Sequence, residues 1–355
     1  MNDMTLSRRA IMTGLAAGAV AYGSGAFPAE LAAPAFGQAR RGSALGDARV
    51  DAAVKAAYDR YRALQEGKNA DYIPALAAVP STYFGVALVG ADGKVHEIGD
   101  SQQLFSIQSV SKPFTAALVM QESGDEAIVN SVGVDATGQV FNSITAVEQS
   151  RGKEMNPLVN PGAIATVGNV KGASPDEVWN KILGIHSDLA GRQLSVNQEV
   201  YKSESDSNQR NRAISALMSA YERFPMDPAV AVDLYTRQCS INVSARDLAV
   251  MGATLAFGGR NPITKKQVID RQHVPGVLAI MATAGLYDDS GKWLFRTGLP
   301  AKSGVGGGIV GVAPGKFGIG TFAPPLDAAG NSVRGQRAIA DIVQALDANP
   351  YAQFG

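Results

Sequence analysis

The spacing of apolar residues predicts a helix followed by a hairpin in the first part of the chain. Apolar side chains recur at helical intervals over residues 47 to about 65, with Arg and Lys on the other face. Residues 82–89 are rich in apolar, β-branched and aromatic side chains and predict a strand. Ala91-Asp92-Gly93 predicts a turn, and residues 94–98 return as the second strand of a hairpin.

The middle of the chain has the periodicity and the start signals of helices. A helix is expected from residue 108 to about 123, with Ser109 in its first turn. From about 173 to 285 the pattern is mostly helical, and Ser174-Pro175-Asp176-Glu177 is typical of a helix start. Further helices are expected over residues 208–223, 228–238 and 245–257.

After Tyr287 the pattern changes to short apolar runs separated by Gly and Pro. These runs predict strands at residues 293–295, 308–312 and 317–322, and a last helix at residues 332–346. Strands are thus expected near both ends of the sequence, with helices between them.

This order of elements predicts an α/β (α+β) fold with one antiparallel sheet flanked by helices, plus an all-helical lobe. The sheet lobe is expected from about 40–108 and 286–355, and the helical lobe from about 109–285. A cleft between two lobes is a usual place for a binding pocket, so we expect the active site there.

Composition narrows the possible partners. The chain has 355 residues, 46% of them hydrophobic, and its 32 Lys and Arg balance its 32 Asp and Glu. Without a basic excess or basic runs, a nucleic-acid partner is not expected, and a neutral or zwitterionic small molecule suits the chain better. One cysteine, Cys239, and only three histidines make disulfides and a zinc site improbable, so no metal and no cofactor are expected.

Residues 1–39 have the pattern of a twin-arginine-type export signal. Ser7-Arg8-Arg9 precedes an apolar stretch over residues 11–27, and a small-residue region ends at Ala39. The stretch is rich in Ala and Gly and is therefore a poor transmembrane span. We expect cleavage near Ala39, a periplasmic or secreted protein and no stable membrane anchor afterwards. If the signal is not used, the protein stays in the cytoplasm.

Ser109 and Lys112 form a Ser-x-x-Lys pair that suits nucleophilic catalysis. Residues three apart on a helix share a face, so the amine can take the proton of the hydroxyl. Burial lowers the pKa of a lysine and lets it act as a base. The pattern by itself also fits a solvated helix start.

Lys302-Ser303-Gly304 strengthens the catalytic interpretation. The β-lactamase and penicillin-binding family pairs Ser-x-x-Lys with a Lys-Thr/Ser-Gly strand in this order. The middle motif of that family is missing, because Ser205-Asp206-Ser207-Asn208 resembles it only in interrupted form. A penicillin-recognising amidase or β-lactamase therefore remains the alternative enzyme.

The sequence is similar to the serine-dependent glutaminases, a family with a β-lactamase/transpeptidase-like fold. The resemblance runs in consistent order from about Ala70 to Val333, roughly three quarters of the chain. The matching blocks are residues 70–74, 105–113, 156–164, Ser203-Glu204 with Arg210-Asn211, Tyr235 with Cys239-Ser240-Ile241, Tyr287-Asp288, 298–305 and 330–333.

The resemblance implies an enzyme that hydrolyses L-glutamine to L-glutamate and ammonia. Ser109 would attack the γ-amide with Lys112 as base, forming an acyl-enzyme. The backbone N–H groups of Ser109 and Val305 would hold the oxyanion, and Tyr287 would pass a proton to the leaving ammonia. Singly, each of these residues also fits a turn, a solvated loop or the core.

The resemblance also implies how the substrate is held. Glu204 would bind the α-ammonium, and Asn211 with the tyrosines would donate to the α-carboxylate. The full set of implied substrate-binding residues is Tyr72, Ser109, Asn160, Glu204, Asn211, Tyr235, Tyr287 and Val305. A homodimer or homotetramer is implied as well. A non-catalytic glutamine-binding protein with the same fold remains the alternative outside enzymes.

One position departs from the family pattern. Pro161 stands where the family usually has a small residue such as Ala, and proline lacks an N–H and fixes φ.

Gly306–Gly311 fits the dinucleotide-binding pattern G-x-G-x-x-G, but that site needs the glycines to open a helix. Here β-branched residues follow, so we expect a strand and no dinucleotide.

Overall fold

Strands from both ends of the described chain form one five-stranded antiparallel sheet with the order β2-β1-β7-β6-β5. The computed structural model describes residues 46–153 and 155–352, so the predicted export signal lies outside the described residues. The five strands are β1 (Gly85–Gly90), β2 (Val95–Gly99), β5 (Ala301–Ser303), β6 (Gly308–Ala313) and β7 (Phe317–Phe322). The expected hairpin is confirmed as β1 and β2, and β1 pairs with β7 along its length.

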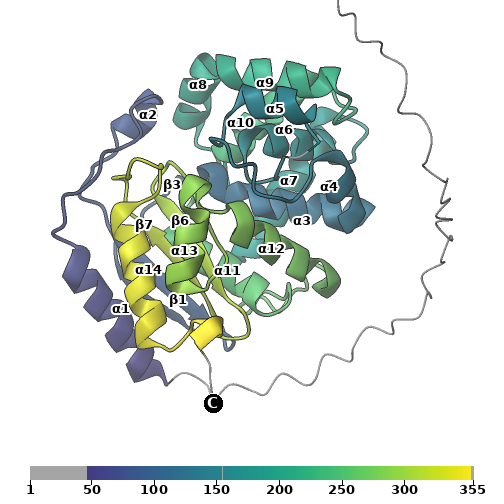
Figure 1. Cartoon of the computed structure of the whole chain (residues 1–355). Helices are drawn as coiled ribbons and strands as arrows, with labels where there is room; N and C mark the ends of the chain where they lie inside the picture. The colour runs from purple at the N-terminus through teal and green to yellow at the C-terminus, as the bar shows by residue number, and fades with distance from the viewer. Residues whose placement is uncertain (1–45, 154, 353–355) are drawn as a thin grey trace, which may run out of the picture. The chain divides into compact units, whose positions relative to one another are not determined.

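Helices cover both faces of this sheet, as Figure 1 shows. Helices α1 (Asp47–Tyr61) and α14 (Val333–Ala345) pack on one face, and α11 (Ala245–Ala256) packs on the other. Alternation along β1 explains this, because Val86 and Leu88 join the core beneath α1 and α14 while Ala87 and Val89 face α11. Both faces are therefore buried.

Two glycines of β7 set the distance between the sheet and α11. A Cβ on Gly318 would lie 1.9 Å from the backbone nitrogen of Ala253, and one on Gly320 would lie 2.1 Å from the carbonyl oxygen of Ala245. Only glycine permits this approach of helix to strand.

The remaining helices gather mostly in a separate group, in which α10 packs against α6, α8 and α9 (Figure 1). They are α3 (Lys112–Ser123), α4 (Asp125–Ser131), α5 (Ile144–Ser150), α6 (Asn160–Gly168), α7 (Pro175–Ala190), α8 (Gln198–Ser207), α9 (Gln209–Ala220), α10 (Pro228–Cys239) and α12 (Val274–Ala284). The other helices and strands of the described chain are short: α2 (Pro74–Ala77), α13 (Ser290–Thr297), β3 (Phe105–Ser106) and β4 (Asn242–Val243); four 3-10 turns lie at Gln108–Ser111, Arg271–His273, Tyr287–Asp289 and Pro350–Ala352.

The predicted fold class is confirmed, and one predicted strand is wrong. Residues 293–295 lie in helix α13, which ends at Gly298 in a left-handed conformation. Trp293 and Thr297, four residues apart, are buried on one side of the helix, while Phe295 is 89% exposed. The apolar triplet suggested a strand because the helical period shows only when Thr297 is included.

The predicted export and the predicted oligomer stay predictions. No helix among the described residues is long and apolar enough to cross a membrane. Export through residues 1–39 and assembly into a dimer or tetramer are not tested by this structure.

Candidate active site

The candidate nucleophile Ser109 lies in a 3-10 turn, Gln108–Ser111, that leads into α3. The predicted helix over residues 108–123, with Ser109 in its first turn, is confirmed, and that first turn is a 3-10 turn. The preceding residue, Gln108, has a φ of 50°, which an L-residue rarely adopts. Strained backbone of this kind gathers at functional sites, where the surrounding structure holds it in place.

Lys112 is the first residue of α3 and is 1% exposed. Its Nζ donates to Oδ1 of Asn160 at 2.7 Å and to the carbonyl oxygen of Leu158 at 3.4 Å, and it makes no hydrogen bond to Ser109. Burial lowers the pKa of Lys112 to about 8. About a tenth of this amine is therefore neutral at pH 7 and able to accept a proton, far more than for an ordinary lysine.

Tyr287 approaches the nucleophile from the sheet side. It opens a 3-10 turn, Tyr287–Asp289, with a φ of 53°. Its hydroxyl group lies close to the side chain of Ser109 and donates to the carbonyl oxygen of Ser303 at 3.3 Å. Burial raises the pKa of Tyr287, so the phenol is protonated and can relay a proton.

Strand β5 brings Lys302 beside this tyrosine. The Nζ of Lys302 donates to the carbonyl oxygens of Gly285 at 2.8 Å and Ser303 at 2.6 Å, and it lies 4.2 Å from the centroid of the Tyr287 ring. Burial and the neighbouring Lys112 hold the pKa of Lys302 well below its usual value. Lys302 thus contacts the tyrosine, not the cavity.

The end of β5 lies against the backbone of the nucleophile. A Cβ on Gly304 would lie 3.3 Å from the backbone nitrogen of Ser109 and 2.9 Å from the carbonyl oxygen of Ile107. Within the described chain, the N–H of the next residue, Val305, has no acceptor. The predicted pair of oxyanion donors, Ser109 and Val305, therefore comes from two segments in close contact.

A cavity of about 210 Å³ lies in front of Ser109. Its lining includes seven of the nine predicted site residues: Tyr72, Ser109, Asn160, Glu204, Asn211, Tyr235 and Val305. The other two, Lys112 and Tyr287, do not line it; Lys112 donates a hydrogen bond to Asn160, and Tyr287 lies close to Ser109. Residues more than 200 positions apart in sequence are thus brought to one site.

Asn160 is the centre of a polar network in this cavity. Its Oδ1 accepts from Lys112 and from the hydroxyl of Tyr235 at 3.3 Å, and its Nδ2 donates to Oδ1 of Asn211 at 3.1 Å. One amide therefore couples the candidate base to two candidate substrate-binding residues.

Glu204 supplies a negative charge to the cavity. It is 7% exposed, and its Oε2 accepts from Nε2 of Gln108 at 3.2 Å. Burial raises the pKa of Glu204 to about 7, although the bond from Gln108 acts in the opposite direction. No arginine or lysine in the part of the chain that the structure describes is bonded to the carboxylate, so it is available to a cationic group of a ligand.

Seven lining residues were not predicted: Ile73, Gln108, Phe141, Asn142, Ser207, Asn208 and Arg210. The ring of Phe141 lies 4.8 Å from that of Tyr287. Gln108 belongs to the nucleophile motif and Arg210 precedes Asn211, so both stood next to predicted residues. Phe141 and Asn142 carry no local signal, because only the folded loop brings them to the cavity.

Pro161 lies in the first turn of α6, next to Asn160. The N–H groups of a first turn have no partner within the helix, so a proline there removes no helical hydrogen bond. The concern that Pro161 disturbs Asn160 is therefore not supported by the local geometry.

We expect Pro161→Ala to leave the KM for glutamine within about twofold, because no helical bond depends on this position. The free energy of unfolding should fall by about 0.4–1 kcal/mol, since proline restricts the unfolded chain. Steady-state kinetics and urea denaturation measure the two quantities. A KM change above tenfold would show that Pro161 shapes the site.

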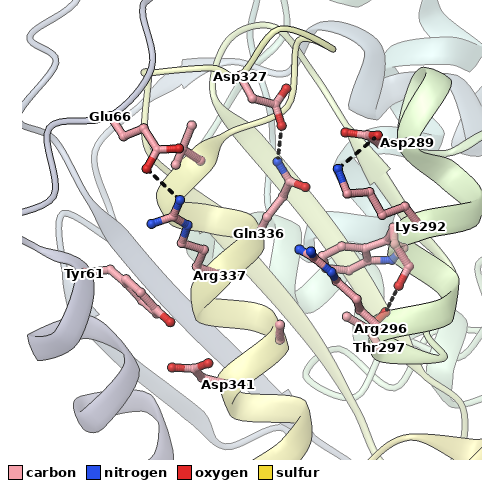
Figure 2. Close-up of a pocket in the computed structure, with 13 residues that line it drawn as sticks. Tyr61, Glu66, Asp289, Lys292, Arg296, Thr297, Asp327, Gln336, Arg337 and Asp341 are labelled. Atoms are coloured by element: carbon pink, nitrogen blue, oxygen red, sulfur yellow. Dashed lines mark hydrogen bonds and ion pairs between the residues drawn. The ribbon is translucent and has the colours of Figure 1, made fainter.

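A second cavity of about 410 Å³ lies between α1, α13 and α14 (Figure 2). It is larger, but none of the predicted site residues line it. Most of its charged groups are paired, Arg337 with Glu66 at 2.6 Å and Lys292 with Asp289 at 3.7 Å. Size alone therefore does not mark the reactive site here.

The glycine pattern at Gly306–Gly311 runs into strand β6, as expected. No helix follows it, so its backbone N–H groups are not presented at a helix start as a dinucleotide pyrophosphate requires.

Comparisons with known proteins agree on one family. The family model described as glutaminase matches residues 67–351. A glutaminase of Colwellia psychrerythraea is 51% identical over 293 residues, covering 82% of this chain and 94% of the relative. Glutaminase 2 of Yersinia pestis is 52% identical over 285 residues, covering 80% and 84%.

Solved structures give the same result. A structure titled as the probable glutaminase ybaS superposes with a TM-score of 0.86 and 45% identity, covering 87% of this chain and 100% of that one. A probable glutaminase from Bacillus subtilis, in complex with 6-diazo-5-oxo-L-norleucine, has a TM-score of 0.73 and 27% identity, covering 85% and 94%. The chain belongs to the glutaminase family.

Proposed function

We propose that this glutaminase hydrolyses the γ-amide of L-glutamine through an acyl-enzyme on Ser109, with Lys112 as the base. The observation that supports this most is the buried Lys112, hydrogen-bonded to Asn160 in the wall of the cavity that contains Ser109. A neutral amine at this position accepts the proton of the serine hydroxyl as its oxygen attacks the amide carbon.

The proposed reaction has two stages. In the first, Ser109 Oγ forms an ester with the glutamyl group, the N–H groups of Ser109 and Val305 stabilise the oxyanion, and ammonia leaves with a proton relayed by Tyr287. In the second, water attacks the ester and releases L-glutamate. The neutral phenol of Tyr287 lies close to Ser109, which supports this relay.

The proposed substrate contacts follow from charge and hydrogen bonding. The buried Glu204 carboxylate binds the α-ammonium, while Asn211, Tyr235 and Tyr72 donate to the α-carboxylate. Tyr72 lines the cavity although it is 58% exposed, which suits a residue at the cavity entrance.

The direct test is ammonia release from L-glutamine, L-asparagine, D-glutamine and nitrocefin by the purified protein. Ammonia from L-glutamine is expected, with little from the other amides and no nitrocefin cleavage. Nitrocefin turnover would support the β-lactamase alternative. Glutamine binding without ammonia release would mean a binding protein.

The pKa values predict a rise of activity with pH. Glu204 must be ionised to bind the ammonium and Lys112 must be neutral to act as base, and their pKa values are about 7 and about 8. We therefore expect kcat/KM to increase from pH 6 to pH 9, with the steepest change between about 7 and 8. A pH profile of kcat/KM measures this, and a fall over the same range would contradict the two roles.

A further inference from the structure

The cavity in front of Ser109 contains two charged lining side chains of opposite sign. Among the fourteen residues that line it, only Glu204 and Arg210 carry a formal charge. Glu204 is at the end of α8 and buried, whereas Arg210 is in the first turn of α9 and exposed. The cavity therefore has a negative group in its wall and a positive group near solvent.

The guanidinium of Arg210 makes only one hydrogen bond within the described residues. Its Nε donates to the carbonyl oxygen of Asn142, another lining residue, at 3.0 Å. No acceptor within the described residues takes a hydrogen bond from its two terminal nitrogens. The bond to Asn142 fixes the side chain and leaves the part that suits a carboxylate open.

The neighbouring Arg212 shows what a purely structural arginine looks like in this helix. Its Nε donates to Oδ1 of Asn208 at 2.7 Å, and its Nη2 donates to the carbonyl oxygen of Ser205 at 3.0 Å. Those bonds join α9 to α8, and Arg212 does not line the cavity.

The charge of Arg210 is not balanced locally. The first turn of α9 contains no acidic residue, and a cation at a helix start is opposed by the helix dipole. A ligand that brings its own anion would relieve this imbalance. An α-amino acid carries a cation and an anion on one carbon, and so complements Glu204 and Arg210 together.

We propose that Arg210 is a specificity-determining residue that binds the α-carboxylate of the substrate, an inference that rests on the proposed glutaminase reaction. Arg210 supplies the positive charge, and the uncharged donors Asn211, Tyr235 and Tyr72 complete the contacts. Amides without an α-carboxylate lose this interaction, so Arg210 selects free amino-acid amides over other amides.

Arg210→Met removes the charge at similar length, and Arg210→Lys keeps the charge without the planar fork. We expect Arg210→Met to raise the KM for L-glutamine roughly 10-fold to 50-fold with kcat changed less than about threefold, as for one lost charge-assisted hydrogen bond. Arg210→Lys should recover part of this loss. Arg337→Met, which removes an exposed arginine outside this cavity, is the matched control.

A pair of inhibitors separates carboxylate recognition from a structural role. L-glutamate and its α-amide, L-isoglutamine, differ only at the α-carboxyl group, and each is measured as a competitive inhibitor of ammonia release. In the wild type L-glutamate should bind the tighter, and in Arg210→Met the ratio of the two Ki values should approach one.

Two outcomes would overturn the proposal. An unchanged KM in Arg210→Met would show that the guanidinium does not touch the substrate. Equal weakening of both inhibitors would show that Arg210 only holds Asn142. Failure of the proposed glutaminase reaction would give a different result, because the wild type would then release no ammonia from L-glutamine.

Discussion

Ser109→Ala is expected to lower ammonia release from L-glutamine by at least about 10⁴-fold, because no other group can form the acyl-enzyme. Lys112→Met should have a similar effect, since it removes the proposed base. Residual activity is measured with a coupled glutamate assay. Turnover within about tenfold of wild type in either variant would refute the assigned pair.

Both variants should remain folded. For Lys112→Met the direction of the change in melting temperature can also be predicted. The pKa of Lys112 in the folded chain is about 8, below the value of 10.5 that is usual for a lysine. The unfolded chain therefore binds the proton more tightly, and at pH 7 the buried charge opposes folding in full. Replacing it with an apolar side chain should leave the melting temperature level or higher.

The matched control for these two variants is Ser111→Ala. Ser111 lies between the pair in the same turn and is fully buried; its Oγ donates to the carbonyl oxygen of Gln108 at 2.7 Å and accepts from Nε2 of Gln238 at 2.9 Å. Its loss should cost about 1–3 kcal/mol of stability, because Nε2 of Gln238 loses this acceptor, but leave the chemistry in place. Inactivity of this control would mean that the turn itself is being disturbed.

Glu204→Gln is expected to lower kcat/KM for L-glutamine roughly 100-fold, mainly through KM, because the buried carboxylate no longer pairs with the α-ammonium. The substitution is isosteric, so the packing around Gln108 is largely kept. The part of the pH profile that rises near 7 should also disappear, since Glu204 has a pKa of about 7.

Glu199→Gln is the control for that experiment. Glu199 lies on the same helix, α8, but is exposed and does not line the cavity. Its kcat/KM should stay within about twofold of wild type, as for most surface substitutions. A near-normal KM in Glu204→Gln would mean that the ammonium is bound elsewhere.

Local sequence patterns were sufficient to predict most helices and strands. They failed where an apolar run was too short, or a helix too completely buried, to show a period. Helix α14 and the hairpin of β1 and β2 have clear patterns and were predicted. Helix α13 was mistaken for a strand from three apolar residues, and α6 was not predicted at all. That helix is buried along its whole length, so it has no polar face to reveal a period.

The sequence by itself determined the family, the fold class and the identity of the candidate nucleophile and base, because these follow from ordered motifs and local spacing. Only the tertiary structure decided which groups share a cavity and how burial changes their chemistry. The pKa of Lys112 depends on desolvation by residues distant in sequence, and Arg210 gains significance only beside Asn142 and Glu204. Electrostatics of this kind depends on distance in space and on exclusion of water, and neither is encoded in the neighbours of a residue along the chain.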